Sequence, residues 1–353
     1  MGSIFKIACN RKGAMLNQRK IEMSERKQLR IFLSVAFVLP YLMGILMGYA
    51  YNRGIDVSFF PNAQMYYPAA GIMLGILVAK KEDGLVPRRF YFFFITITAV
   101  ILLMTIASAF VSKPGFIAFL NLVIIIGSAA SWIILLAEKK EKRDAYGLRA
   151  HNGKMSALMV LLFLALYFGR ILLSYLAGGQ MNEFAKIFQN PRFYSMILIL
   201  PFNFFLVFTA FFGEEYGWRY YFTPFLQKHF GKVRGVLLLG VLWGLWHLPI
   251  NIFYYSPETW LQSILSQQIT CIGMGIFFSY TYLKTNNIWV PVILHYLNNN
   301  LIAVLNSGNA DVINNQLISW KDVLLLLIFN LVLFVPFIFA KEFREPEKKD
   351  NSL

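Results

Sequence analysis

Three charged side chains stand at the end of a long apolar run: Glu214, Glu215 and Arg219. A charged side chain at the centre of a membrane helix costs about 2.5–3.5 kcal/mol on insertion scales, so such residues need a reason to be there. Glu215 and Arg219 are four residues apart, which places them on one helix face where their charges neutralise each other. Glu214 is rotated by about 100° from Glu215 and has no such partner. Two interpretations are open at this point, a pair of interfacial charges at a helix end or the carboxylates of a functional site.

A histidine stands within the next apolar run, at position 247. Trp243 precedes His247 by one helical turn and lies on the same face. Pro249 has no backbone N–H to donate, so we expect the helix to loosen just past the histidine. A single buried histidine is more often a structural hydrogen-bonding group, so this element alone does not establish a site.

The third polar element carries His295 and Asn299, which are four residues apart and share a helix face. Polar pairs of this kind also hold membrane helices together, and that alternative stands for the pair taken alone. Intramembrane ionisable residues usually face a bundle interior or a wet cavity, however, and mark function. Three such elements in successive apolar runs therefore favour one functional site over three unrelated contacts.

These residue types are suited to hydrolysis. No serine stands in a nucleophile elbow, and no candidate catalytic cysteine accompanies the motifs. A carboxylate and a histidine can hold and deprotonate a water molecule. A histidine and an asparagine amide can donate hydrogen bonds to the oxyanion that forms when this water attacks a carbonyl group. Two histidines and a glutamate can also ligate zinc, but the compact His-Glu-x-x-His helix is absent. We therefore expect hydrolysis of a peptide bond without a cofactor and keep zinc as the second interpretation.

The elements that position these residues must be membrane helices. Of the 353 residues, 58% are hydrophobic and only 14% are charged, whereas soluble domains carry about 25% charged residues. The apolar runs are roughly 18–22 residues long, the length that crosses a bilayer core of about 30 Å. We predict an all-α, polytopic membrane helix bundle with about ten transmembrane helices, the short second of which is also compatible with a re-entrant segment. The predicted spans are 31–51, 65–79, 90–111, 116–137, 155–177, 193–215, 235–253, 261–283, 288–305 and 323–340.

Charge sets the expected topology. The net charge is +15, but the basic residues lie in loops, where they fix orientation and contact anionic lipid, so nucleic acid is not an expected partner. The spans alternate under the positive-inside rule, with both termini and the loop 138–154 in the cytoplasm. Cys9 and Cys271 provide neither a disulfide framework nor metal-site spacing. We divide the chain into a basic cytoplasmic segment, N-terminal helices without a recognised motif, a catalytic core, and a last helix with a charged tail: 1–30, 31–190, 191–305 and 306–353.

The three polar elements resemble the motifs of the CAAX protease and bacteriocin-processing family, also called CPBP or Abi. That family shows Glu-Glu-x-x-x-Arg, then an aromatic residue shortly before a histidine, then His-x-x-x-Asn or a similar pair. The corresponding segments here are 214–219, 243–247 and 295–299. Tryptophan replaces the commoner phenylalanine at position 243. The resemblance covers about residues 193–305.

The resemblance implies an intramembrane endopeptidase. It implies that Glu214 and His247 activate a water molecule and that His295 and Asn299 form the oxyanion hole. It further implies supporting roles for the other motif residues, Glu215, Arg219 and Trp243. The expected partners are the lipid bilayer and a peptide or membrane-protein substrate, and the expected location is the plasma membrane.

Two other functions are open at this stage. Family members include bacteriocin-immunity proteins, so a catalytically silent immunity or scaffold protein is the main alternative. A transporter that uses Glu214 and the histidines as a proton relay is a weaker one, because the sequence shows no internal repeat. The phenylalanine-rich, charge-poor composition is typical of bacterial chains, so prenylated CAAX proteins are not the substrates that we expect.

Overall fold

The computed structural model describes residues 22–111, 115–306 and 310–344. The regular elements of these residues are all helices, with no strand among them, which confirms the predicted all-α class. The predicted basic segment 1–30 lies largely outside the described residues. Its last part, from Glu22 onward, is the beginning of the first long helix rather than a separate lead-in.

The N-terminal part of the chain forms a group of packed helices. The first helix, Glu22–Tyr51, includes the π-helical stretch η1 (Ser34–Val38) and ends as α2 (Leu39–Tyr51). The helices that follow are α3 (Phe59–Gln64), α4 (Tyr67–Ala79), α5 (Arg88–Ser108), α6 (Phe116–Ala137) and α7 (Lys140–Ala145). α4 packs against the first helix and against α5, and α5 packs against α6.

The second part of the chain supplies the polar motifs. Its elements are α8 (Gly153–Ala177), α9 (Met181–Gln189), α10 (Pro191–Glu215), η2 (Tyr216–Phe222), α11 (Thr223–Phe230), α12 (Lys232–Trp246), α13 (Leu248–Ile250), η3 (Asn251–Tyr255), α14 (Trp260–Thr285), α15 (Trp289–Leu305), η4 (Ala310–Ile313), α16 (Trp320–Leu333), η5 (Val335–Phe339) and α17 (Lys341–Arg344). α10, η2 and α11 are continuous and form one helix of 40 residues, Pro191–Phe230. The predicted sixth span therefore continues well past the Glu214–Glu215 pair.

The helix lengths and composition are those of a multi-pass membrane protein. In the described part, seven helices are long and apolar enough to cross a membrane, or eight if the bent pair Lys232–Trp246 and Leu248–Tyr255 is one span. The predicted ninth span is α15, which has 17 residues. The predicted second span is α4, whose 13 residues give about 20 Å of helix against a bilayer core of about 30 Å. The total of about ten spans and the cytoplasmic position of both ends stay predictions.

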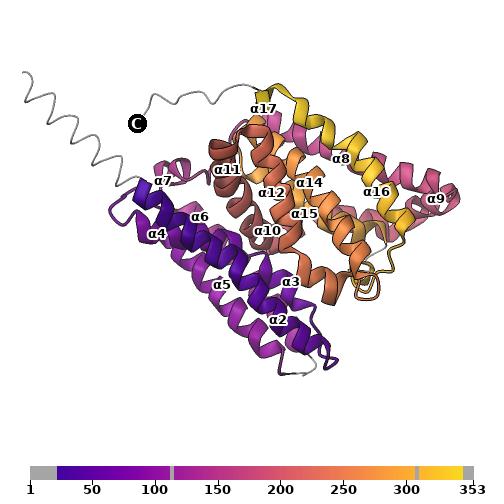
Figure 1. Ribbon diagram of the computed structural model, residues 1–353, viewed down its shortest axis with the longest axis horizontal. Helices are drawn as coiled ribbons and strands as arrows, with labels where there is room; N and C mark the ends of the chain where they lie inside the picture. The colour runs from indigo at the N-terminus through magenta and orange to yellow at the C-terminus, as the bar shows by residue number, and fades with distance from the viewer. Residues whose placement is uncertain (1–21, 112–114, 307–309, 345–353) are drawn as a thin grey trace, which may run out of the picture.

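The long helix that carries the two glutamates joins the two parts of the molecule. Figure 1 shows α2 to α6 on one side, α8 and α14 to α16 on the other, and α10 to α12 between them. α10 packs against α4 and α6 and also against α15. Large apolar side chains are exposed on the outward faces, among them Leu198 and Phe202 on α10 and Ile45 on α2. Exposed apolar surface of this extent marks a membrane-facing surface.

A local signal fixes where α10 begins. Pro191 occupies its first turn, where the missing N–H costs nothing. The side chain of Asn190 accepts a hydrogen bond from the backbone N–H of Arg192 at 3.0 Å, which is an N-cap. With its start fixed, the helix carries Glu214 and Glu215 to a set depth in the bundle.

A second local signal breaks the helix beside the histidine. α12 ends at Trp246, and the chain bends by 41° before it continues from Leu248. Pro249 lacks the N–H that an unbroken helix would use. The predicted loosening just past His247 is therefore confirmed, and it places the histidine at a bend instead of inside a regular helix.

Candidate active site

The two carboxylates lie at the end of α10, deep inside the bundle. Glu214 is 2% exposed and Glu215 is 0% exposed. Gly213 and Gly217 flank them. A Cβ atom on Gly213 would overlap the backbone between α3 and α4, and one on Gly217 would overlap Pro68 in the first turn of α4. The missing side chains let α10 and η2 press directly against the N-terminal helices. This contact fixes the direction in which the carboxylates point.

Glu215 forms the predicted ion pair with Arg219. Arg219 Nε lies 3.1 Å from Glu215 Oε2, and Nη1 donates to Oε1 at 3.2 Å, so the guanidinium contacts both carboxylate oxygens. Neither side chain is exposed. The same carboxylate accepts a hydrogen bond from Nδ1 of His295 at 2.8 Å. Glu215 thus holds one partner on its own helix and a second on α15.

Trp243 lies at the centre of the cluster. Its indole N–H donates to Oε2 of Glu214 at 2.8 Å. Its ring centroid lies 6.0 Å from that of His247 and 5.7 Å from that of His295. The guanidinium of Arg219 lies over the same ring, 4.2 Å from the centroid, in a cation–π contact. The sequence placed Trp243 only beside His247, whereas in the structure it contacts all three polar elements.

His247 is oriented by its own helix. Its Nδ1 donates to the carbonyl oxygen of Trp243 at 2.8 Å. In the neutral ring this leaves the lone pair on Nε2, the nitrogen that can accept a proton or a hydrogen bond. α12 ends at Trp246 and the chain bends by 41° before α13 begins at Leu248, so the ring of His247 lies at the bend.

Cys271 also lies beside His247, and the sequence did not reveal this contact. Its sulfur is 3.8 Å from Nδ1 of His247 and accepts a hydrogen bond from Gln267 at 3.4 Å. A cysteine therefore lies beside one of the motif residues in space, and the absence of a catalytic cysteine stays a prediction. The two residues are distant in sequence, and the packing of α12 against α14 brings them together. Gly240 permits that packing, because a Cβ atom there would lie 2.7 Å from the Cα of Ile272.

Asn299 lies one turn beyond His295 on α15, as the spacing predicts, and is more exposed than the rest of the cluster. Its Oδ1 accepts a hydrogen bond from the side-chain amide of Asn298 at 3.0 Å. The amide nitrogen of Asn299 is therefore the group that can donate to a substrate.

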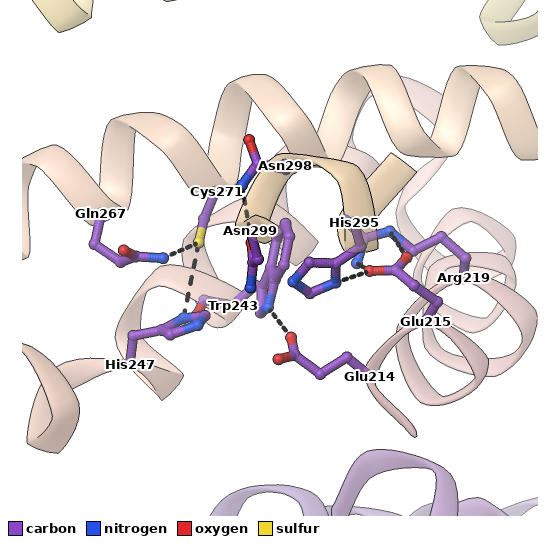
Figure 2. Close-up of polar contacts among 10 residues, drawn as sticks. All are labelled: Glu214, Glu215, Arg219, Trp243, His247, Gln267, Cys271, His295, Asn298 and Asn299. Atoms are coloured by element: carbon purple, nitrogen blue, oxygen red, sulfur yellow. Dashed lines mark hydrogen bonds and ion pairs between the residues drawn. The ribbon is translucent and has the colours of Figure 1, made fainter. Parts of the chain in front are cut away.

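The four predicted catalytic residues come together in space. Figure 2 shows Glu214, His247, His295 and Asn299 grouped around the ring of Trp243. They come from α10, from the bend after α12 and from α15. Among the described residues, Oε1 of Glu214 and Nε2 of both histidines have no hydrogen-bond partner. The atoms that could do chemistry are the ones that the protein leaves free.

The part of the chain that carries these residues is similar to known proteases. A family model described as Type II CAAX prenyl endopeptidase Rce1-like matches residues 196–301. The chain is also 32% identical over 188 residues to CAAX prenyl protease 2 of Methanococcus maripaludis, and the match covers 48% of this chain and 68% of that protein. The chain belongs to the CAAX prenyl protease family. It is therefore a membrane-embedded CAAX-type endopeptidase, a hydrolase, and the resemblance of the motifs is confirmed. No solved structure matches it.

The donor set of this endopeptidase does not fit a zinc ion as it is arranged. Catalytic zinc takes three protein ligands, each about 2.0–2.3 Å from the metal. In the part of the chain that the structure describes, no three His, Cys, Asp or Glu side chains are grouped closely enough to hold a metal ion.

The N-terminal helices of the endopeptidase take part in the site, although they carry none of its motifs. The indole N–H of Trp246, next to His247, donates to the carbonyl of Ala36 at 2.7 Å. The carbonyl of Trp246 accepts a hydrogen bond from Gln64 at 2.8 Å. These contacts hold the bend at His247 from outside the motif-bearing core.

Hydrogen bonds of two tyrosines connect the loops at the other end of these helices to the site. The hydroxyl of Tyr216, next to Glu215, donates to the carbonyl of Tyr146 at 2.9 Å. The hydroxyl of Tyr146 donates to Asp83 at 2.6 Å. Burial alone would raise the pKa of Asp83, but the hydrogen bonds from Tyr146 and from the backbone of Leu85 bring this pKa below its ordinary value. The loop carboxylate is thus an ionised acceptor at the end of a chain of hydrogen bonds that reaches the residue beside Glu215.

Proposed function

We propose that this endopeptidase hydrolyses a peptide bond within the bilayer by means of a water molecule that Glu214 and His247 activate. The observation that carries the proposal is the grouping of four polar side chains around the ring of Trp243, with Oε1 of Glu214 and Nε2 of both histidines free of hydrogen-bond partners among the described residues. No residue of this set is a nucleophile that would form a covalent intermediate. A bound and activated water is the nucleophile that such a set can supply.

Glu214 acts as the general base. Its Oε1 takes a proton from the water as the water oxygen attacks the scissile carbonyl carbon, and it returns that proton to the amide nitrogen when the C–N bond breaks. The hydrogen bond from Trp243 holds the other oxygen, so the carboxylate keeps one orientation. His247 presents the lone pair of Nε2 and accepts the second hydrogen of the water, which directs the water oxygen toward the carbonyl.

His295 and Asn299 stabilise the oxyanion. His295 already donates through Nδ1 to Glu215, so its Nε2 can donate as well only when the ring is an imidazolium. In that form the N–H of Nε2 and the side-chain amide of Asn299 are the two donors for the oxyanion.

The substrate is a peptide or a membrane-protein segment that reaches the site within the bilayer, and the enzyme resides in the plasma membrane. The relative's name describes a protease for prenylated CAAX proteins. The lipid-facing helices of the present chain are consistent with a substrate that partitions into the membrane. The chemistry of the four side chains requires only an amide bond and sets no requirement for a prenyl group.

A thiol mechanism is the second candidate, because the sulfur of Cys271 lies 3.8 Å from Nδ1 of His247. A cysteine nucleophile needs a histidine nitrogen that can accept the thiol proton. The nitrogen that faces the sulfur is the one that donates to the carbonyl of Trp243. The observed hydrogen bonding therefore favours the water mechanism.

Hydrolysis of a fluorogenic peptide by the purified protein in detergent or vesicles tests the proposal. Glu214→Gln is expected to reduce kcat by at least about 100-fold, as loss of a general base does, while thermal stability and elution volume stay those of the wild type. Glu258→Gln, which removes an exposed carboxylate between η3 and α14, is the matched control and should retain full activity. A folded Glu214→Gln protein with wild-type turnover would refute the mechanism.

A further inference from the structure

Arg170 is a charged residue inside a membrane span that the proposed mechanism does not use. It lies in α8, one of the candidate spans, seventeen positions from Gly153 and seven from Ala177. Among the described residues its guanidinium pairs with no carboxylate. Ionisable residues at such positions usually pair with a group in the protein or in what the protein binds. The side chain is partly buried, so a cation stands here without an anion.

The guanidinium is held at depth and does not reach for the nearer end of its helix. It lies over the ring of Tyr167, 5.1 Å from the centroid. Tyr167 is one turn closer to Gly153 and is 1% exposed. An arginine that snorkels to the membrane surface would extend in the opposite direction, toward Ala177. The cation–π contact therefore keeps the positive charge inside the span.

The face of α8 that carries Arg170 packs, two turns earlier at Phe163, on a helix that borders the active site. Phe163, Tyr167 and Arg170 are spaced by four and three residues and share one face of the helix. The ring of Phe163 packs on the ring of Phe278 at 6.2 Å, and that ring lies 6.1 Å from the ring of His295. One aromatic side chain thus separates this face from the oxyanion histidine.

Arg170 also lies at a depth that fits a substrate contact. The side-chain amide of Asn287 donates to the hydroxyl of Ser156 at 3.0 Å, so α8 and α15 start side by side from this contact. At 1.5 Å per residue, Tyr167 is about 17 Å from the contact along α8, and Asn299 is about 18 Å from it along α15. The guanidinium over the Tyr167 ring is therefore level with the outer edge of the catalytic set.

We propose that Arg170 binds a carboxylate of the peptide substrate and thereby places the scissile bond in the active site. The inference rests on the proposed function, because it assigns a substrate contact to that same site. A guanidinium matches a carboxylate in charge and in planar geometry. A C-terminal carboxylate and an acidic side chain near the cut share this chemistry. Either one, carried into the bilayer, would supply the anion that Arg170 lacks.

Binding to three fluorescent peptides tests the inference without reliance on hydrolysis. The probes are a short apolar peptide with a free C-terminal carboxylate, the same peptide as a carboxamide, and the carboxamide with its last residue changed to Asp. Anisotropy is measured with the full-length Glu214→Gln protein in phosphatidylcholine vesicles, with and without Arg170→Gln. Arg192→Gln, an exposed cation at the start of α10, is the matched control. The same measurements in vesicles that contain phosphatidylglycerol show whether lipid phosphate is the anion.

We expect Arg170→Gln to weaken binding of the free-carboxylate peptide by about 10- to 100-fold, the usual effect of losing a charge-assisted hydrogen bond. Binding of the carboxamide should not change, and Arg170→Lys should restore part of the loss. If the Asp-terminated carboxamide binds as well as the free-carboxylate peptide, Arg170 accepts any carboxylate. If it does not, Arg170 is specific for the C-terminal carboxylate.

Three results overturn the inference. The first is equal affinity for the carboxylate and carboxamide peptides, which includes no binding of either. The second is an equal loss of affinity for both peptides in Arg170→Gln, and the third is a loss of affinity that depends on the phosphatidylglycerol content alone. Failure of the wild type to hydrolyse any peptide would refute the proposed function instead and would leave the binding result standing.

Discussion

Glu215→Gln should cost both stability and activity, for two separable reasons. The change leaves the guanidinium of Arg219 charged and without its anion at a position that is 0% exposed. Removal of one partner of a buried ion pair costs about 3–5 kcal/mol, because the remaining charge has neither water nor a counterion. It also takes the anionic acceptor from Nδ1 of His295, so we expect turnover to fall by about 100-fold or more, as when an oxyanion donor is lost.

A second variant separates the two losses. Glu215→Gln combined with Arg219→Met removes both charges, and a neutral replacement of a buried pair is often nearly as stable as the pair itself. Stability, measured by unfolding in mixed detergent, should therefore recover by most of the 3–5 kcal/mol. Activity should not recover, because His295 still lacks a carboxylate partner.

The control is an ion pair at the surface. Glu183 and Lys186 on α9 are 2.7 Å apart with side chains 58% and 65% exposed, and Glu183→Gln should cost no more than about 1 kcal/mol. A Glu215→Gln protein as stable as this control and fully active would show that the pair neither holds the fold nor orients His295. Recovered turnover in the double variant would refute the second role alone.

Activity should survive exhaustive treatment with 1,10-phenanthroline, and a loss that near-stoichiometric zinc restores would instead make His247 and His295 metal ligands. Cys271→Ala should retain most of the turnover of the wild type, whereas a loss as deep as that of Glu214→Gln would support the thiol mechanism. Gly217→Ala should lower the stability in detergent by about 1–3 kcal/mol, because the added methyl group meets tightly packed backbone, and an unchanged melting temperature would contradict that packing. Single cysteines placed in the loop 138–154 should be protected from impermeant reagents in intact cells, and labelling from outside would overturn the predicted topology.

The sequence predicted those features of the site that lie within one helix. The ion pair of Glu215 with Arg219 and the common face of His295 and Asn299 follow from spacing alone, since 3.6 residues per turn fixes them whatever surrounds the helix. The bend past His247 follows in the same way from the chemistry of proline.

The contacts between helices could not be predicted in this way. The hydrogen bond from Trp243 to Glu214 and the approach of Cys271 to His247 depend on how α10, α12 and α14 pack. Periodicity gives the direction in which a side chain points around the axis of its own helix. It does not determine how two helices lie relative to each other. The hydrogen bond from Trp246 to the carbonyl of Ala36 is also a contact between helices. The sequence therefore contained no sign that the N-terminal helices, which carry no motif, contact the site.

The fold class followed from composition, but the helix ends did not. The predicted spans leave residues 216–234 outside the membrane helices, yet the helix continues to Phe230. Trp218, Arg219 and Phe222 are buried there, so the helix is stabilised by packing on neighbouring elements and not by its own apolar length. The same limit applies to α4, whose 13 residues are enclosed by other helices and need not span a bilayer.

The position of Arg219 one turn after Glu215 has a consequence for biogenesis. During synthesis the helix Pro191–Phe230 leaves the ribosome before α15 exists, so His295 cannot yet neutralise Glu215. A nascent helix that carried this acid alone would present a net charge to the lipid until the chain had grown by some eighty residues. With the guanidinium on the same helix, Glu215 meets the membrane already paired, and only Glu214 still waits for its partner Trp243 on a later helix. The imidazole arrives later and docks onto a carboxylate that is already fixed in place, so the order of the motifs along the gene is also the order in which the site can be assembled.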